Sequence, residues 1–170
     1  MIYFTSDQHW GHTKIITLCN RNFPDTHTMN VHMVECWNSV IKPYDEVYFL
    51  GDFGLCTKKS MAFFLYKLNG KKYFIKGNHD KTNILNWMVN TNQIEWWDYD
   101  HEFQYEYKGV KYTFILSHYQ HQPQKDNVIC LYGHSHGKSK PVKGSMDVGV
   151  DSVGYVPLSI EQIIQKIFEV

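Results

Sequence analysis

The sequence Phe-Ile-Lys-Gly-Asn-His-Asp, residues 74–80, joins an apolar strand to a group of polar side chains. Packing alone does not favour Asn78, His79 and Asp80 at the end of such a strand, because burying them without partners costs several kcal/mol. In open α/β sheets, ligands bind beyond the carboxyl ends of the strands. The stretch therefore predicts a functional site at the end of this strand.

The same arrangement recurs at four other apolar runs of the chain. Residues 2–6 lead to Asp7 and His9, residues 47–51 to Asp52, residues 112–117 to His118, and residues 128–133 to His134 and His136. Each run delivers a side chain that can bind a metal ion to its carboxyl end. A single buried His or Asp is more often structural, but this repetition favours one shared site over coincidence.

The composition is that of a globular protein, and we expect one domain over residues 1–170. Hydrophobic residues make up 43% and aromatic residues 16% of the chain, which excludes a disordered protein. The 17 basic and 17 acidic side chains balance, so charge alone predicts no general affinity for polyanions. A nucleic-acid partner would have to be attracted locally.

The cysteines indicate a reducing compartment. They form no Cys-x-x-Cys pair and lie in or beside apolar runs, which favours free thiols over disulfides. The sequence has no secretory leader pattern, and none of its apolar runs approaches the ~20 residues of a membrane span. We therefore expect a cytoplasmic protein without a membrane partner.

The order of expected elements indicates a layered α/β architecture. Strands are expected at 1–6, 45–50, 72–76, 128–132 and 145–150, with a strand-rich stretch at 94–114 that turns at Lys108-Gly109. Helices are expected at 13–19, 26–41, after a Thr57 cap, at 82–90, and from Ser159, where Gln162 completes a capping box. Strands alternate with helices early and crowd together late, which predicts a second sheet packed on the first.

Seven side chains at the strand ends are candidate metal ligands: Asp7, His9, Asp52, Asn78, His118, His134 and His136. Carboxylates, an amide and imidazoles together suit Mn, Fe, Zn or Ni, whereas Ca and Mg favour all-oxygen sites. Seven ligands are too many for one catalytic ion that keeps an open position. They suit two ions that share a carboxylate, and such ions, about 3.5–4 Å apart, clamp a phosphoryl group and activate a bridging water.

These motifs, in this order, resemble those of the calcineurin-like metallophosphoesterase superfamily. The blocks are Asp7-x-His9, Gly51-Asp52, Gly77-Asn78-His79-Asp80, His118 and Gly133-His134-x-His136. They span residues 7–136, and the chain is similar to the short bacterial and phage phosphoesterases of the superfamily. The resemblance implies an α/β fold, a four-layer double β-sandwich flanked by helices, with the site at the strand ends.

The resemblance also implies a role for each site residue. The first ion is held by Asp7, His9 and His136, Asp52 bridges, and the second ion is held by Asn78, His118 and His134. His79 is the catalytic residue, as general acid to the leaving oxygen or as a stabiliser of charge on the phosphoryl group. The implied cofactors are two divalent transition-metal ions, Mn before Fe, Ni or Zn, and the implied nucleophile is a hydroxide that bridges them.

One departure from the family's pattern bears on the substrate. Relatives of the protein phosphatases carry Gly-Asp-x-x-Asp followed by Arg-Gly, whereas Asp52 is followed here by residues 53–55, Phe-Gly-Leu. We therefore expect a phosphodiesterase acting on nucleotides or nucleic acids, with no obligate protein partner. A phosphomonoesterase is the first alternative. A noncatalytic scaffold of the same fold is less favoured, because the ligands and His79 are all present.

Two further residues are candidates for binding the substrate phosphate. His12 is equally suited to reaching the substrate and to hydrogen-bonding the first loop. Arg21, the only arginine in the chain, has forked donors that match phosphate oxygens, although a surface salt bridge is the more frequent use. Trp96 and Trp97 can stack nucleobases, but the alternating aromatic residues around them fit sheet packing better.

Overall fold

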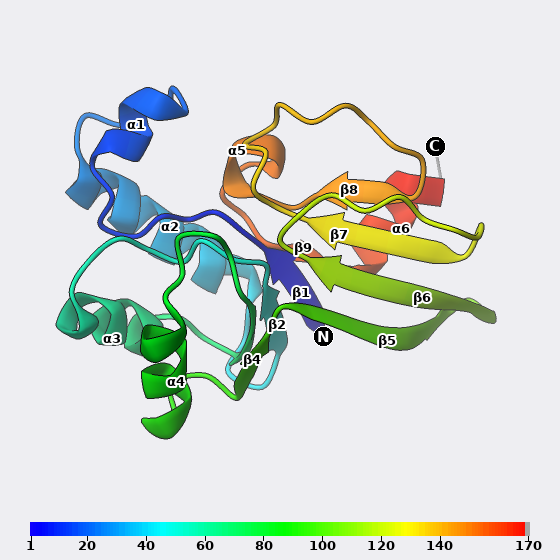
Figure 1. The fold of residues 1–170 in the computed structure, drawn as a ribbon, viewed down its shortest axis with the longest axis horizontal. Helices are drawn as coiled ribbons and strands as arrows, with labels where there is room; N and C mark the ends of the chain where they lie inside the picture. Colours follow the sequence, from blue (N-terminus) through cyan, green and yellow to red (C-terminus); the bar gives the residue numbers. More distant parts are fainter. Residues whose placement is uncertain (169–170) are drawn as a thin grey trace.

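The computed structural model describes residues 1–168 and folds them into two β-sheets flanked by helices (Figure 1). The strands are β1 (Ile2–Thr5), β2 (Glu46–Phe49), β3 (Lys71–Ile75), β4 (Trp96–Asp98), β5 (Asp100–Tyr107), β6 (Val110–Ser117), β7 (Val128–Tyr132), β8 (Ser145–Asp147) and β9 (Leu158–Ser159). The helices are α1 (Lys14–Leu18), α2 (Thr26–Val40), α3 (Lys58–Lys67), α4 (Thr82–Asn90), α5 (Val150–Val153) and α6 (Ile160–Phe168).

The pairing of the strands brings their carboxyl ends to one side of the molecule. In the first sheet, of order β4-β3-β2-β1-β9, strands β1 to β4 are parallel. In the second sheet, of order β5-β6-β7-β8, strands β6, β7 and β8 are parallel and β5 is antiparallel to β6. The arrows of β1, β6 and β7 point the same way in Figure 1. The expected layered α/β architecture, with a second sheet against the first, is confirmed.

Two apolar cores hold these layers together. One lies between the first sheet and helices α2, α3 and α4, and its buried members include Trp37 of α2, Leu65 of α3, and Phe49 and Phe74 of the strands. The other joins the two sheets and α6, and its members include Phe4, Ile75, Phe114, Leu131 and Ile163. Because both cores share the first sheet, the strand ends of that sheet are held in place from both faces.

Local signals set the starts of three helices, and the caps at Thr57 and Ser159 were expected. The side chain of Asp25 accepts the Thr28 N–H at the start of α2, and Thr57 accepts the Ser60 N–H at the start of α3. At α6 the capping box is reciprocal: Ser159 accepts the Gln162 N–H at 3.2 Å, and the Gln162 side chain accepts the Ser159 N–H at 2.8 Å.

The expected strand at 145–150 is wrong in its second half. Strand β8 ends at Asp147, and the short helix α5 follows after Gly149. The Gly149 N–H donates to the Asp147 side chain, and the Val150 N–H donates to the Ser6 carbonyl, which ends the strand and turns the chain toward the end of β1. This turn carries Asp151 to the site described below.

The tryptophan pair packs against the sheet, as the alternation favoured. The Trp96 ring lies 4.7 Å from the His101 ring and 5.4 Å from the Tyr73 ring, centroid to centroid. The Trp97 indole N–H donates to the Asn86 side chain of α4. Over residues 1–168, the structure has no helix long and apolar enough to cross a membrane.

Candidate metal centre

The structure brings all seven candidate ligands together at the strand ends. Asp7 and His9 follow β1, Asp52 follows β2, Asn78 follows β3, His118 follows β6, and His134 and His136 follow β7. Their side chains form one chain of contacts with Asp52 in the middle. The convergence of residues that lie far apart in sequence follows from the parallel pairing within each sheet.

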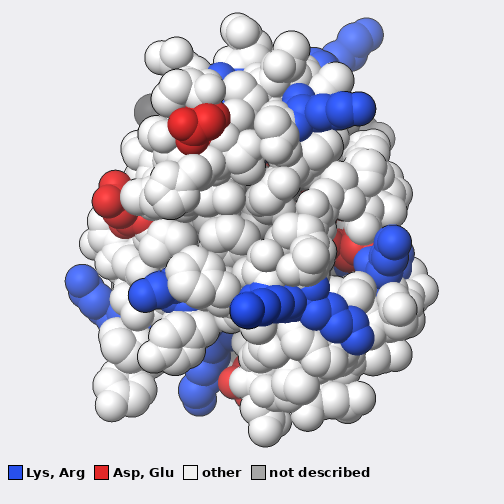
Figure 2. All heavy atoms as spheres, turned by 90° about the vertical axis from the view of Figure 1, so that its left-hand side faces the viewer, with Lys and Arg blue, Asp and Glu red and all other residues white. Residues whose placement is uncertain are grey.

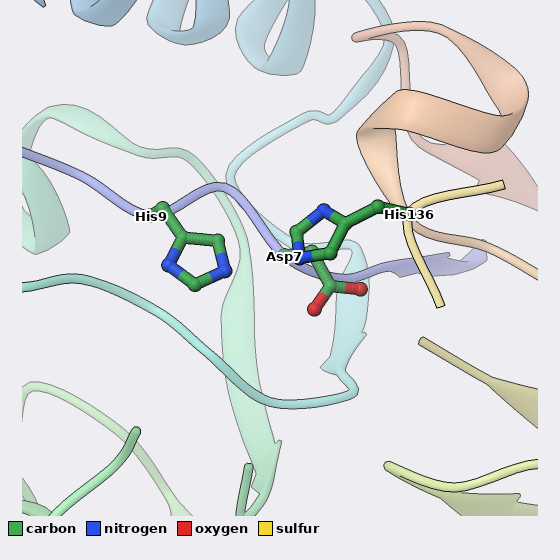
Figure 3. Close-up of side chains that lie close together, drawn as sticks. All are labelled: Asp7, His9 and His136. Carbon is green, nitrogen blue, oxygen red and sulfur yellow. The ribbon is translucent and has the colours of Figure 1, made fainter. Parts of the chain in front are cut away.

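The first group of ligand atoms comes from Asp7, His9 and His136. One ligand atom from each of the three lies within 4.8 Å of the others. Figure 3 shows the three side chains projecting into one space, two from the loop after β1 and His136 from the loop after β7. Asp7 and His9 are buried, and His136 is half-buried.

The second group is centred on the Asn78 side-chain oxygen. It lies 2.9 Å from His118 Nε2 and 2.9 Å from His134 Nδ1. The other nitrogen of His118, Nδ1, lies 2.7 Å from the Leu50 carbonyl oxygen, to which it donates, so that Nε2 is left with its lone pair toward the site. Asn78 and His134 are exposed, so this group opens to solvent.

Asp52 lies between the two groups. Its Oδ2 is 3.6 Å from His9 Nε2 and 3.6 Å from His118 Nε2. The side chain is 2% exposed, and its Oδ1 accepts the His79 N–H at 2.9 Å. A carboxylate in this position touches both groups of ligands, which is the placement a bridging ligand needs.

The backbone at the site is held in an unusual conformation. Five of the seven ligand residues have left-handed backbone, with φ of 61° at Asp7, 54° at His9, 59° at Asp52, 67° at His134 and 48° at His136. Such conformations cost of order 1–3 kcal/mol each in residues other than glycine, and they cluster at functional sites. The fold therefore directs these side chains inward at a cost in stability.

Two glycines allow the loops to approach each other at the site. A Cβ added at Gly77 would collide with the Asp52 side chain, and one added at Gly133 would collide with Ser6 and Asp7. Each glycine directly precedes a ligand, Asn78 or His134. The Gly-Asn and Gly-His pairs of the motifs therefore have a packing reason.

The buried ligand atoms lack partners within the protein. Asp7 Oδ1 and both ring nitrogens of His9 are buried without a hydrogen bond. Burial raises the pKa of Asp7 to about 7 and lowers the pKa of His9 to about 2, which disfavours a bare carboxylate and an imidazolium here. A divalent cation satisfies a carboxylate and a neutral imidazole at once, so this donor set fits a metal ion.

His79 stands at the solvent side of the centre. Its side chain is 47% exposed, and its Nε2 lies 3.9 Å from Asp52 Oδ2. The ring is 5.5 Å from the ring of His9, centroid to centroid. The residue is thus held by its backbone on Asp52 while its ring faces the opening, which suits a group that exchanges protons with a substrate.

Arg21 lies behind the site and not at its mouth. Its side chain is fully buried, and it donates to the carbonyls of Asp7 and Gln8 and to both oxygens of Asp151. The position corrects the expectation of a surface residue, and with its donors occupied by the protein Arg21 is not placed to clamp a substrate. It braces the loop that carries Asp7.

Asp151 is a site residue that the sequence motifs did not reveal. Its Oδ2 lies 2.6 Å from His136 Nδ1, which donates to it, and this contact is the main cause of a raised pKa at His136. This hydrogen bond orients the His136 ring and leaves Nε2 free. Many metal-binding histidines are oriented by a carboxylate in the same way. Because Asp151 lies 130 residues from Arg21 and 15 from His136, local sequence carries no signal of this network.

His12 lies beside the candidate ligand His9. Its ring is 5.5 Å from the ring of His9, and its Nδ1 is buried without a hydrogen bond. Burial is the main cause of a lowered pKa at His12. His12 Nδ1 thus makes no hydrogen bond within the first loop.

Comparison with known proteins agrees with this arrangement. Residues 22–151 match the calcineurin-like phosphoesterase superfamily domain. The chain belongs to the calcineurin-like phosphoesterase superfamily. Members are metal-dependent, and membership indicates the hydrolysis of phosphoesters.

Several known proteins match this chain over most of their length. An uncharacterized protein of Methanocaldococcus jannaschii is 32% identical over 98% of this chain and 90% of its own. The Gene 66 protein of Mycobacterium phage D29 is 25% identical over 81% of this chain and 79% of its own. A solved protein of unknown function from Aquifex aeolicus is 25% identical, with a TM-score of 0.73 over 98% of this chain and 99% of that chain. An archaeal phosphodiesterase, 19% identical, shares the fold with a TM-score of 0.51 over 95% and 94%.

Within the calcineurin-like superfamily, this chain lacks the second aspartate of the protein phosphatases, and Asp80 does not replace it at the His79 ring. The Asp80 carboxylate accepts the N–H groups of Gly77, Asp52 and Phe53, at 2.9, 2.8 and 3.0 Å. It thereby ties the loop after β3 to the loop after β2. Burial raises the pKa of Asp80 although the three donors stabilise its charge. Asp80 is thus a residue that positions Asp52.

Proposed function

We propose that this protein is a phosphoesterase that uses two divalent transition-metal ions, with manganese as the first candidate, and that phosphodiesters are its substrates. The observation that carries the proposal is the convergence of seven donor side chains on two adjacent groups that share Asp52. We propose further that residues 1–170 act as one domain.

The proposed ligand sets follow the two groups. Asp7, His9 and His136 would hold one ion, and Asn78, His118 and His134 would hold the other. Asp52 would contribute to both. When bound, a pair of such ions lowers the pKa of a shared water towards ~7 and offsets charge on a phosphoryl group.

The protein's own residues orient the ligand loops and supply a proton to the departing oxygen. Arg21 and Asp151 fix the loop of Asp7 and the ring of His136, and Asp80 fixes the loop of Asp52. The oxygen of water gives up a proton to solvent and forms the new bond to phosphorus while the ester P–O bond breaks. The departing oxygen takes its proton from His79, whose exposed ring stands beside Asp52.

The preference for diesters rests on what surrounds the phosphate. A phosphomonoester carries an additional charge that protein phosphatases meet with an arginine, and the fully buried Arg21 is not available for that purpose. Lysine residues lie scattered over the face toward which the strands point, where basic side chains outnumber acidic ones (Figure 2). Such a face attracts phosphate esters as anions. The proposed preference for a diester of nucleotide or nucleic-acid type over a monoester therefore rests on the lack of a free arginine at the site.

The experiment is a metal analysis combined with a substrate panel. Protein loaded with Mn is expected to bind two ions per chain and to hydrolyse a chromogenic diester faster than the matching monoester. Asp52→Asn is expected to abolish turnover and lower metal content, because the shared ligand is weakened. Asp126→Asn, an exposed carboxylate in the loop between β6 and β7 and outside both ligand groups, is the matched control.

Three outcomes separate the alternatives. Unchanged turnover in Asp52→Asn would refute the bridging role. Faster hydrolysis of the monoester would replace the diesterase by the monoesterase. A folded protein that binds no metal and stays inert with added Mn would favour the noncatalytic scaffold.

A further inference from the structure

A cavity of about 420 Å³ opens beside His79, outside the two ligand groups. It lies between the loop after β2 and the helices α3 and α4. Its lining residues are Phe53, Gly54, Leu55, Cys56, Thr57, Met61, His79, Asp80, Lys81, Ile84, Leu85 and Met88. None of the seven candidate ligands lines it, so it is separate from the metal centre but shares His79 with the reaction.

The lining is apolar and offers few hydrogen bonds. Met61, Leu85 and Met88 are buried and form its apolar lining together with Ile84. The Asp80 oxygens are already occupied by backbone N–H groups, and the Thr57 hydroxyl caps α3. Apart from His79, Lys81 and the Cys56 thiol, the lining side chains offer no free partner to the hydroxyl groups of a sugar or another polyol. Each hydroxyl left without a partner costs about 1–3 kcal/mol.

The cavity has the features of a ligand pocket. Its volume falls in the range of roughly 300–1,000 Å³ that is usual for small-molecule sites lined by apolar side chains. At its edge Leu55 is 41% exposed although it is apolar. The flexible side chains of two methionines adapt to ligands of different shape. A void formed by packing alone has no reason to open at the catalytic histidine.

We propose that this cavity binds the apolar part of the leaving alcohol, an aryl or alkyl group, and so determines which esters are cleaved. The inference rests on the proposed function, in which His79 gives its proton to the leaving oxygen. A group on that oxygen must lie on the His79 side of the phosphorus, where the cavity opens. The substrate class is thus a phosphodiester whose leaving alcohol is apolar. A nucleotide part of such a diester stays on the phosphorus, and no polyol is released.

The test compares two diesters that differ only in the leaving alcohol, 2-naphthylethanol or ethanol, which have similar acidity. The wild-type protein is expected to prefer the naphthylethyl ester at least tenfold in kcat/KM, within the roughly 10–200-fold range of apolar pockets. Ile84→Trp fills the cavity from α4 and is expected to lower this ratio about tenfold. Asn83→Trp adds the same indole at the neighbouring exposed position and is expected to leave the ratio unchanged.

A binding measurement separates this proposal from the proposed function. Free 2-naphthylethanol is titrated into the wild-type protein and both variants and followed by fluorescence. Binding that Ile84→Trp abolishes and Asn83→Trp retains supports the pocket. If no phosphoester is cleaved although this binding pattern holds, the proposed function fails and the pocket remains. Equal binding in both variants, or a substrate ratio near one in the wild type, overturns the pocket.

A second variant guards against misfolding of the first. Leu55→Trp fills the cavity from the partly exposed loop after β2, where a larger side chain is tolerated. It is expected to lower the ester ratio in the same direction as Ile84→Trp. Retention of the wild-type ratio in a folded Leu55→Trp protein would also overturn the proposal.

Discussion

At the scale of single residues, the site contains two kinds of side chain: buried candidate metal ligands and an exposed candidate proton donor. Asp7, His9 and Asp52 are buried and fixed by the backbone around them, whereas His79 presents nearly half of its side chain to solvent. The Asp52 carboxylate connects the two kinds, because it touches His9 and His118 and also accepts the His79 N–H. Substitution should therefore have different consequences at the two kinds of position.

Substituting His79→Ala should slow hydrolysis but leave metal binding intact. A proton donor contributes about 10²–10⁴ in rate, and the loss should be largest for esters whose leaving alcohol is least acidic. The measurement is kcat/KM over a series of leaving groups, with metal content determined in parallel. An equal loss for all leaving groups would remove the role of acid and leave only electrostatic help.

At the scale of elements, short segments outside the motifs hold the ligand loops in place. The segment after α1 supplies Arg21, and α5 supplies Asp151, and the two join the loop after β1 to the loop after β7. A one-turn helix gains little from its own hydrogen bonds, so α5 depends on this contact for its position. The site is thus supported by tertiary contacts of small elements as well as by the strands.

Replacement of Arg21 by Met should destabilise the fold at this junction. It leaves the largely buried Asp151 without its guanidinium partner and with His136 alone, and breaking a buried pair costs up to about 3–5 kcal/mol. The free energy of unfolding in urea measures the loss, and weaker metal binding should accompany it, because both Asp7 and His136 lose support. Arg21→Lys keeps the charge but not the forked geometry of the donors. Its free energy of unfolding should therefore lie between those of the wild type and Arg21→Met. Wild-type stability in Arg21→Met would contradict the bracing role.

At the scale of the whole molecule, the metal centre joins the two sheets. Four ligands follow strands of the first sheet: Asp7, His9, Asp52 and Asn78. The other three, His118, His134 and His136, follow strands of the second sheet. Ions bound between them would connect the sheets at the edge where the apolar core ends. Metal binding and the stability of the fold should therefore be linked.

Removal of metal with a chelator should lower the melting temperature, and addition of Mn should restore it. A ligand at one hundred times its Kd stabilises the native state by about 2.7 kcal/mol. For a chain of this size, that corresponds to roughly 5–10 °C. Calorimetry with and without Mn measures the shift, and Asp52→Asn should reduce it. A melting temperature independent of metal in the wild-type protein would show that the sheets do not depend on the centre.

What the sequence alone determined were the features that local patterns encode. The alternation of strands and helices, the caps at Thr57 and Ser159, and the polar residues at the ends of apolar runs each follow from neighbours in the chain. The expected strand at 145–150 was wrong because the bonds of Gly149 and Val150, one of them to distant Ser6, ended it early.

Only the tertiary structure decided how these residues support one another. It buried Arg21 against Asp151, turned the Asp80 carboxylate onto three backbone N–H groups, and left an apolar cavity beside His79. The arginine contact depends on segments brought together across 130 positions, and a cavity is a property of packed helices and loops. Local sequence encodes which side chain stands at a strand end, whereas its partners are selected by the pairing of strands and the packing of layers.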